Sequence, residues 1–404
     1  MLSVQQKEGY DTRKPRRRSS KLSSGFINSE DSPIDFEILY YPQYQDQNGQ
    51  VICYPDSVFE GIVKLKVSKP IPAHHIKLIF KATERINYDA IGWERLASKE
   101  GRLFAVRTLL WGYPAKTDVP ADQWPILEVG EHTFPFVCQM PVINYPPTFH
   151  HHLISTAFKL IVSVERPGKL SILSRGFPVT FRPIIETAPV KNIHHFTEET
   201  KLTNHVLAQL SLPRLAYNLI DERSIPISIQ FLSDTHEEDN ISLSQLRICL
   251  KRYYDINYKN FSRSETAVIA ETVYPNTIHT CPYSLSLPLN LPKFSNNFPY
   301  SLTYSPFLKV EYKLIVTAKV RHGPLTVKKK LFETPILLGT LPAGTRAPRQ
   351  LENFNYKSEN DQLKNMPSFL RPQPKEMEGE EYLPAYDSDC VPPRYLLPVI
   401  LSPV

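Results

Sequence analysis

The chain has 404 residues, a net charge of +6, and five cysteines. This length allows two domains with tails, and the modest charge argues against nucleic acid as a partner, because nucleic-acid-binding domains carry stronger basic patches. The cysteines are odd in number and widely spaced, which argues against a disulfide framework or a cysteine zinc site and favours a reducing compartment. There is no apolar leader at the start and no run of 18 apolar residues, so we expect a cytoplasmic protein.

Residues 1–33 are rich in serine and basic residues. This composition cannot bury enough apolar surface to order itself, so we predict a disordered arm. The run from Arg16 to Arg18 would suit a kinase that reads upstream arginines, which makes Ser19 and Ser20 candidate phosphorylation sites. A solvated basic arm, or a nuclear-import-like run, is the alternative interpretation.

From Ile34 onward the sequence alternates with a period of two. Residues 63–67 (VKLKV) and 76–82 (IKLIFKA) place apolar residues on one face and mostly lysines on the other, as half-buried strands do. These lysines lie on two neighbouring predicted strands, so they could converge on an acidic partner or an anionic membrane surface. A plain solvated face is the simpler alternative. The lysines are Lys64, Lys66, Lys77 and Lys81.

The alternation continues through residues 130–141, 157–166 and 177–183, and prolines mark the turns between these segments. No long amphipathic helix is indicated. Many short strands separated by Pro-bearing turns are typical of antiparallel β-sandwiches, so we predict an all-β fold.

The second half of the chain resembles the first. FKLIVSV at residues 158–164 corresponds to YKLIVTA at residues 312–318, an offset of 154 residues (158 to 312). Similar offsets relate CQMP, which ends at Pro141, to LNLP, which ends at Pro292. Order and spacing together predict two copies of one sandwich.

Breaks in the alternation give the predicted domain boundaries. We predict a disordered arm at 1–33, a first domain at 34–186, an interdomain linker at 187–204, a second domain at 205–342 and a disordered tail at 343–404.

The tail contains Pro392-Pro393-Arg394-Tyr395, a P-P-x-Y motif. Adjacent prolines hold the backbone near polyproline II geometry, which WW domains bind with little loss of entropy. Chance occurrence in a proline-rich tail is the alternative.

Three consecutive histidines, His150 to His152, raise the question of a metal site. Consecutive residues point in different directions, so one ion cannot easily take all three, and we expect no metal here. The paired His194 and His195 fit a solvated linker. No phosphate loop, H-E-x-x-H or G-x-S-x-G motif occurs, so we expect neither a cofactor nor an enzyme.

Several strings, in their order along the chain, resemble the α-arrestins, the arrestin-related trafficking adaptors of fungal type. They are YPDSVFEGIVKLKVSKP (54–70, with Gly61 at the family's glycine), GEHTFPFVCQMP (130–141), TAFKLIVSVERPG (156–168), VEYKLIVTAKV (310–320), TPILLGTLP (334–342) and LPAY (383–386) ahead of PPRY. The resemblance covers about residues 34–342 and the tail.

This resemblance implies two tandem arrestin-like, immunoglobulin-like β-sandwiches and a ubiquitin-ligase adaptor at the plasma membrane and endosomes. The body would bind a membrane transporter or receptor, and a WW-domain HECT-type ligase would bind Pro392, Pro393 and Tyr395, so that the cargo is ubiquitinated and endocytosed. Leu383, Pro384 and Tyr386 would form a second, weaker WW contact. An arrestin-fold coat or sorting subunit, and a scaffold in pH or nutrient signalling, are the alternatives. Candidate ubiquitin acceptors in the tail are Lys357, Lys364 and Lys375.

Overall fold

The computed structural model describes residues 32–46, 48–87, 100–114, 117, 119–187, 195–203, 205–233, 240–258, 261–275, 277–280, 282–292, 300–305, 307–322, 325–355 and 366–371. Within these ranges the regular structure is strand, apart from two 3-10 helices of three residues each at Pro42–Tyr44 and Ala121–Gln123. The all-β prediction is therefore confirmed. In the part of the chain so described, no helix has the length and apolar character needed to cross a membrane.

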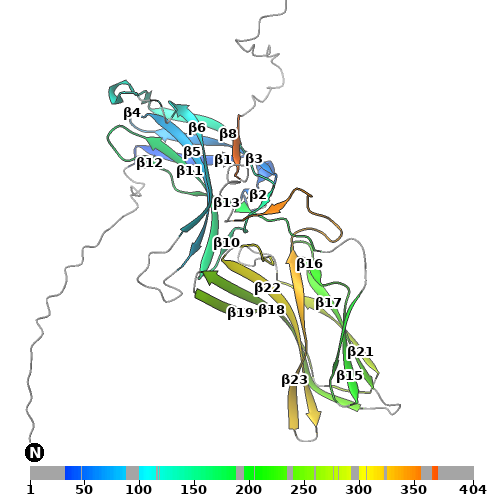
Figure 1. The fold of residues 1–404 in the computed structure, drawn as a ribbon. Helices are drawn as coiled ribbons and strands as arrows, with labels where there is room; N and C mark the ends of the chain where they lie inside the picture. Colours follow the sequence, from blue (N-terminus) through cyan, green and yellow to red (C-terminus); the bar gives the residue numbers. More distant parts are fainter. Residues whose placement is uncertain are drawn as a thin grey trace, which may run out of the picture. The chain divides into compact units, whose positions relative to one another are not determined.

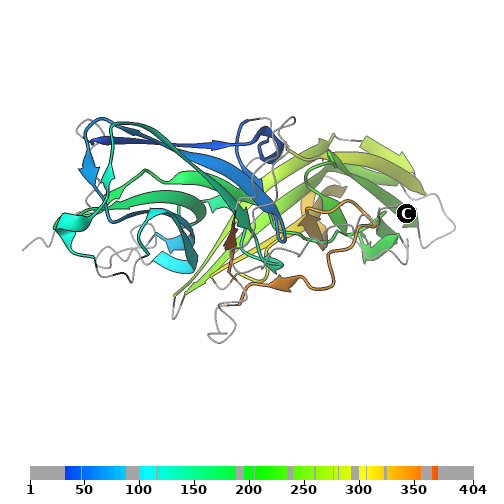
Figure 2. The same ribbon diagram turned by 90° about the horizontal axis from the view of Figure 1, so that it is seen from above.

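The first sandwich pairs a four-stranded sheet with a larger one (Figures 1 and 2). The four-stranded sheet has the order β1 (Ile34–Tyr40), β3 (Val58–Val67), β8 (Gly130–Gln139) and β25 (Ser368–Leu370). The larger sheet has the order β2 (Ile52–Cys53), β13 (Phe177–Phe181), β11 (Ile154–Glu165), β5 (His75–Ile86) and β6 (Glu100–Gly112), with β10 (Phe149–His150) and β12 (Ile172–Leu173) beside β11. Two further pairs are β4 (Ile71–Pro72) with β7 (Ile126–Leu127) and β24 (Glu352–Asn353) with β9 (Ile143–Asn144).

The second sandwich is built in the same way. Its smaller sheet has the order β14 (Phe196–Lys201), β15 (Val206–Leu212), β17 (Ser224–Ser233) and β21 (Tyr283–Asn290). Its larger sheet has the order β16 (Ala216–Asn218), β23 (Leu325–Gly339), β22 (Leu308–His322), β18 (Asn240–Tyr258) and β19 (Phe261–Tyr274), with β20 (Thr277–Thr280) beside β18.

The strand order of the larger sheet repeats between the two sandwiches. β13, β11, β5 and β6 of the first correspond to β23, β22, β18 and β19 of the second, and in both a short parallel strand adds to one edge. The matching strings at residues 158–164 and 312–318 fall on β11 and β22, the corresponding inner strands. The predicted internal repeat thus has a counterpart in the topology.

Each sandwich closes on a core made from alternate residues of its facing sheets. In the first, Phe59 of β3 meets Phe80 of β5 edge to face, with ring centroids 5.5 Å apart. The inward residues predicted for β11, from Phe158 to Val164, are all buried. Burying one such side chain contributes about 1.5–3 kcal/mol relative to exposure, so these alternating runs specify the register of both sheets.

Two boundary predictions are wrong in part. The predicted linker contains strand β14, and the predicted disordered tail contains β24 and β25, which pair with β9 and β8 of the first sandwich. β14 escaped detection because its sequence, FTEETK, has a single apolar residue, Phe196, and therefore shows no apolar alternation. β24 and β25 are two and three residues long, too short for a period to show. Residues 356–365 and 372–404 of the tail lie outside the described residues, as does the arm up to residue 31.

Gly61 supplies a test of this packing. It lies on β3, where an added Cβ would come within 2.6 Å of the Leu39 carbonyl oxygen and 2.9 Å of the Phe136 ring. Gly61→Ala should therefore lower the free energy of unfolding of the first sandwich by about 1–3 kcal/mol, measured by chemical denaturation. The matched control is Gly176→Ala, whose new Cβ would meet only the flexible side chain of Lys159. Equal stability of the two variants would contradict this assignment.

Candidate functional site

The residues predicted to bind WW domains lie outside the described residues, so the structure neither brings them together nor separates them. The same holds for the candidate phosphorylation sites and ubiquitin acceptors. The residues concerned are Pro392, Pro393, Tyr395, Leu383, Pro384, Tyr386, Ser19, Ser20, Lys357, Lys364 and Lys375. The structure describes the two sandwiches and the segment by which the tail is attached to the first of them, which we call the root of the tail.

The root of the tail is strand β25, which adds to the edge of β8. Phe369 pairs with Cys138 in this ladder and packs against the core of the first sandwich, together with Met366 and Phe354. Phe354 lies 5.0 Å from the Tyr145 ring. The chain is therefore fixed to the first sandwich up to Leu370, 22 residues before Pro392 (370 to 392).

The four strand lysines do not converge, which leaves the simpler alternative of a solvated face for them. Lys64 and Lys66 lie on β3, whereas Lys77 and Lys81 lie on β5, and these strands belong to different sheets of the sandwich. The segment between β3 and β5 carries the chain from one sheet to the other, so the strands do not form a hairpin. Because apolar residues of both strands face the common core, the lysines point outward from opposite sheets.

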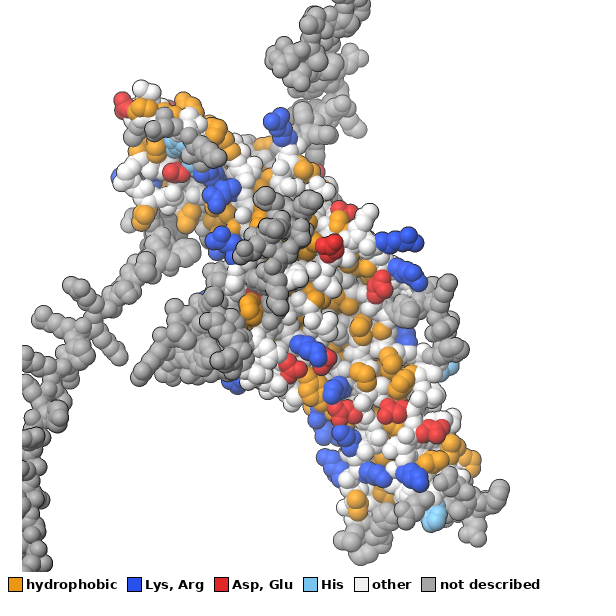
Figure 3. Space-filling view, in the orientation of Figure 1, with side chains coloured by type: hydrophobic (Ala, Val, Ile, Leu, Met, Phe, Trp, Pro, Cys, Tyr) orange, Lys and Arg blue, Asp and Glu red, His pale blue; other side chains and the backbone are white. Residues whose placement is uncertain are grey.

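A different cationic surface lies on the second sandwich, and we call Lys319, Arg321 and Lys328 its cationic face. Lys319 on β22 stands directly opposite Lys328 on β23, and all three side chains are exposed. None has an ion-pair partner among the described residues. Lys and Arg side chains gather over this part of the surface in Figure 3. The run VKKKL at 327–331 is the sequence signal for this face.

Like charges directly opposite one another destabilise a strand pair. The Lys319–Lys328 pair is therefore a place where an anionic partner would relieve repulsion. Beside it, Arg247 makes a bidentate contact with Glu271, at 2.8 and 2.7 Å. The surface therefore combines a neutralised pair with uncompensated cations.

The two sandwiches share an apolar contact. Ile86, Phe149, Leu153 and Ile154 of the first sandwich are buried in the same hydrophobic cluster as the core of the second. The segment that follows β13 also bonds to the end of β23, where the Ile185 N–H donates to Thr340 Oγ1 at 2.8 Å. These contacts hold the last residues of β5 and the start of β11 against the second sandwich.

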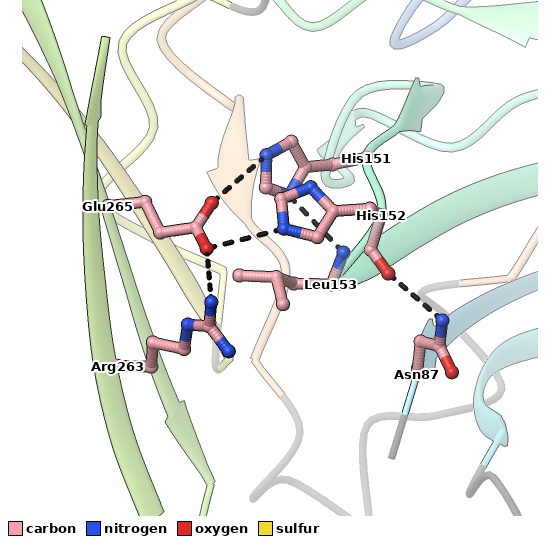
Figure 4. A network of polar contacts seen from close by, with 6 residues as sticks. All are labelled: Asn87, His151, His152, Leu153, Arg263 and Glu265. Carbon is pink, nitrogen blue, oxygen red and sulfur yellow. Dashed lines mark hydrogen bonds and ion pairs between the residues drawn. The ribbon is translucent and has the colours of Figure 1, made fainter. Parts of the chain in front are cut away.

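A polar cluster borders this contact (Figure 4). His151 and His152 precede β11, and both rings point toward Glu265 of β19. His152 Nε2 lies 3.2 Å from Glu265 Oε1, and His151 Nε2 lies 3.6 Å from Oε2. Burial, with help from the charge of His152, lowers the pKa of His151 to about 4. We expected consecutive histidines to point in different directions. His150 is exposed and lies apart from the cluster, but His151 and His152 point toward the same carboxylate.

Glu84 is a buried acid at the same contact. It takes an inward position near the end of β5 and is 1% exposed. The Ser305 hydroxyl of the second sandwich donates to Glu84 Oε1 at 2.9 Å, while Oε2 has no hydrogen-bond partner among the described residues. Burial raises the pKa of Glu84 from 4.5 to about 7, and the Ser305 hydrogen bond opposes this rise. The strand predicted here ends at residue 82, and no sequence pattern indicated that Glu84 is buried against a partner 221 residues away.

Glu84 should make stability depend on pH. Because its folded pKa lies above its unfolded value of 4.5, the folded chain holds more protons between pH 4.5 and 7, and the free energy of unfolding falls as pH rises through this window. The loss is at most about 3 kcal/mol. Glu84→Gln should remove this slope, measured by urea unfolding at pH 5 and pH 8. The exposed Glu128→Gln is the control, and an unchanged slope in Glu84→Gln would refute the assignment.

One family model matches the second sandwich. Residues 203–343 match the model of the family "Arrestin (or S-antigen), C-terminal domain". No curated protein sequence is significantly similar to the chain. The match covers β15 to β23 of the described strands. Since the first sandwich repeats the same strand order, the chain folds as two tandem arrestin-like β-sandwiches, the second of which matches the arrestin C-terminal domain family.

Proposed function

We propose that this chain is a trafficking adaptor of the α-arrestin kind. Its arrestin-like body would bind a membrane transporter or receptor, and its tail would recruit a WW-domain HECT-type ubiquitin ligase for ubiquitination and endocytosis of that cargo. The observation that carries this proposal is a P-P-x-Y motif 22 residues beyond the strand that anchors the tail (370 to 392), in a chain with an arrestin-like body.

The weak binding expected of the tail motif explains why the tail and the body would have separate roles. A short Pro-rich ligand binds its domain at roughly micromolar strength, about −8 kcal/mol. Such a contact alone does not select one cargo among many. Selection would then come from the body, and the anchoring of β25 to β8 would keep the ligase within a fixed chain length of it.

The ligase contact is tested by binding of isolated WW domains of a HECT ligase to the full chain. Tyr395→Ala should weaken binding at least about tenfold, because the motif loses the ring that completes it. Tyr386→Ala should cost less, since its motif lacks one proline. Tyr382→Ala, a tyrosine in neither motif, is the control. Equal binding by the wild type and Tyr395→Ala would refute the contact. Absence of binding by the wild type would favour a coat or sorting subunit.

The cationic face is our candidate for the cargo contact. It presents three exposed cations without ion-pair partners among the described residues. The four strand lysines of the first sandwich, in contrast, are divided between two sheets. An acidic cytoplasmic segment of the cargo would relieve the Lys319–Lys328 repulsion.

Reversal of both charges tests this contact. Lys319→Glu with Lys328→Glu preserves the like-charge pair, so stability should not change, but binding of an Asp/Glu-rich peptide should fall about tenfold at low salt. Fluorescence anisotropy measures this, and the loss should shrink at high salt. The control is Lys64→Glu with Lys66→Glu on β3. If this control loses as much affinity, the contact is not specific to the cationic face.

A further inference from the structure

The contact between the sandwiches contains a set of metal-binding groups drawn from both. One imidazole nitrogen each from His151 and His152, and one carboxylate oxygen of Glu265, all lie within 4.8 Å of one another. The histidines come from the segment before β11 of the first sandwich, and the glutamate comes from β19 of the second. In Figure 4 the two rings and the carboxylate converge on a single region.

Their spacing fits a tetrahedral ion. Zinc binds imidazole nitrogen and carboxylate oxygen at about 2.0–2.2 Å, which separates neighbouring ligands of a tetrahedron by roughly 3.3–3.6 Å. His152 Nε2 lies 3.2 Å from Oε1 and His151 Nε2 lies 3.6 Å from Oε2, so each imidazole lies near one carboxylate oxygen at about this separation. The three ligand atoms all lie within 4.8 Å of one another. Two histidines and a glutamate, with one position open to water, form a known zinc ligand set. We propose that His151, His152 and Glu265 bind one zinc-class transition-metal ion that links the two sandwiches.

Surrounding contacts hold the three ligands in place. The Asn87 side-chain amide donates to the His152 carbonyl at 3.1 Å, and the His151 N–H donates to the Ile154 carbonyl at 3.0 Å. The His151 ring lies 4.6 Å from the Tyr254 ring of the second sandwich. Because the turn is fixed by these bonds, the imidazoles need little rearrangement to receive an ion.

Arg263 orients the carboxylate. Its guanidinium lies 2.8 Å from Glu265 Oε1, and a carboxylate can accept further partners on its remaining lone pairs. Hydrogen-bonded second partners of this kind orient metal-binding carboxylates in general. The pair therefore supports the proposed ligand and does not occupy all of it.

Two contacts have to change when the ion binds. The hydrogen bond between His152 Nε2 and Glu265 Oε1, at 3.2 Å, gives way to bonds of both residues to the ion, and His152 Nε2 gives up its proton. The Leu153 N–H donates to His151 Nδ1 at 3.4 Å, whereas a neutral histidine that binds metal through Nε2 carries its proton on Nδ1. At that length the hydrogen bond is weak, so its loss opposes binding only slightly. Hard cations are disfavoured by the nitrogen ligands, since calcium and magnesium prefer oxygen.

The direct test uses the full chain, stripped of metal and titrated with zinc chloride in a calorimeter. We expect one ion per chain, at least about tenfold weaker binding by His152→Ala and by Glu265→Gln, and unchanged binding by His150→Ala. The side chain of His152 is 57% exposed, so its removal tests the ligand with little risk to the fold. His150 is exposed and outside the cluster, which makes it the matched control. No binding by the wild type, or equal binding by His152→Ala, overturns the proposal.

Two further readouts identify the ligands and the linkage. With cobalt(II) in place of zinc, the site should show no thiolate-to-metal charge-transfer absorption, and such a band would assign binding to cysteines instead. Zinc should raise the thermal midpoint of the wild type and of His150→Ala but not of His152→Ala, because the ion binds only the folded arrangement. A rise of equal size in His152→Ala would refute the site. The proposal does not depend on ligase recruitment.

Discussion

The larger sheet of each sandwich depends on an inner strand that is paired along most of its length. β11 lies between β13 and β5, and β22 lies between β23 and β18. Their inward side chains, such as Leu160 and Leu314, are fully buried. A charge at such a position would lose its hydration without a partner, so these strands tolerate little change at their inward positions.

Two sheet edges of this chain are protected against pairing with another chain. An open edge strand presents unpaired backbone groups that invite association with another chain. β25 covers the edge of β8, and the polar β14, which carries Glu198, Glu199 and Lys201, forms the edge of the second sandwich beside β15. The first part of the tail thus protects the sheet and is not only a spacer for a binding motif.

How much the sequence could predict depends on how far apart the interacting residues lie. The runs on β11 and β22 are long and regular, so the fold class and the repeat were readable from the sequence. β25 is three residues long, and its partner strand β8 lies more than 200 residues earlier, so no local pattern indicates it. Lys64 and Lys77 looked like neighbours because they are close in sequence, yet the chain changes sheet between them. Conversely, His152 and Glu265 are 113 residues apart and meet only through the fold.

The contact between the sandwiches buries ionisable groups together with apolar side chains. Glu84 loses hydration there and accepts one hydrogen bond among the described residues, so its negative charge opposes the contact at neutral pH. Phe149 and Leu153 bury apolar surface in the same region and favour it. Terms of opposite sign leave a contact that is weaker than a core of the same area would be. A modest added interaction, such as an ion held by His151, His152 and Glu265, would then shift the balance between tight and loose association of the sandwiches, whereas the same interaction inside either core would change little.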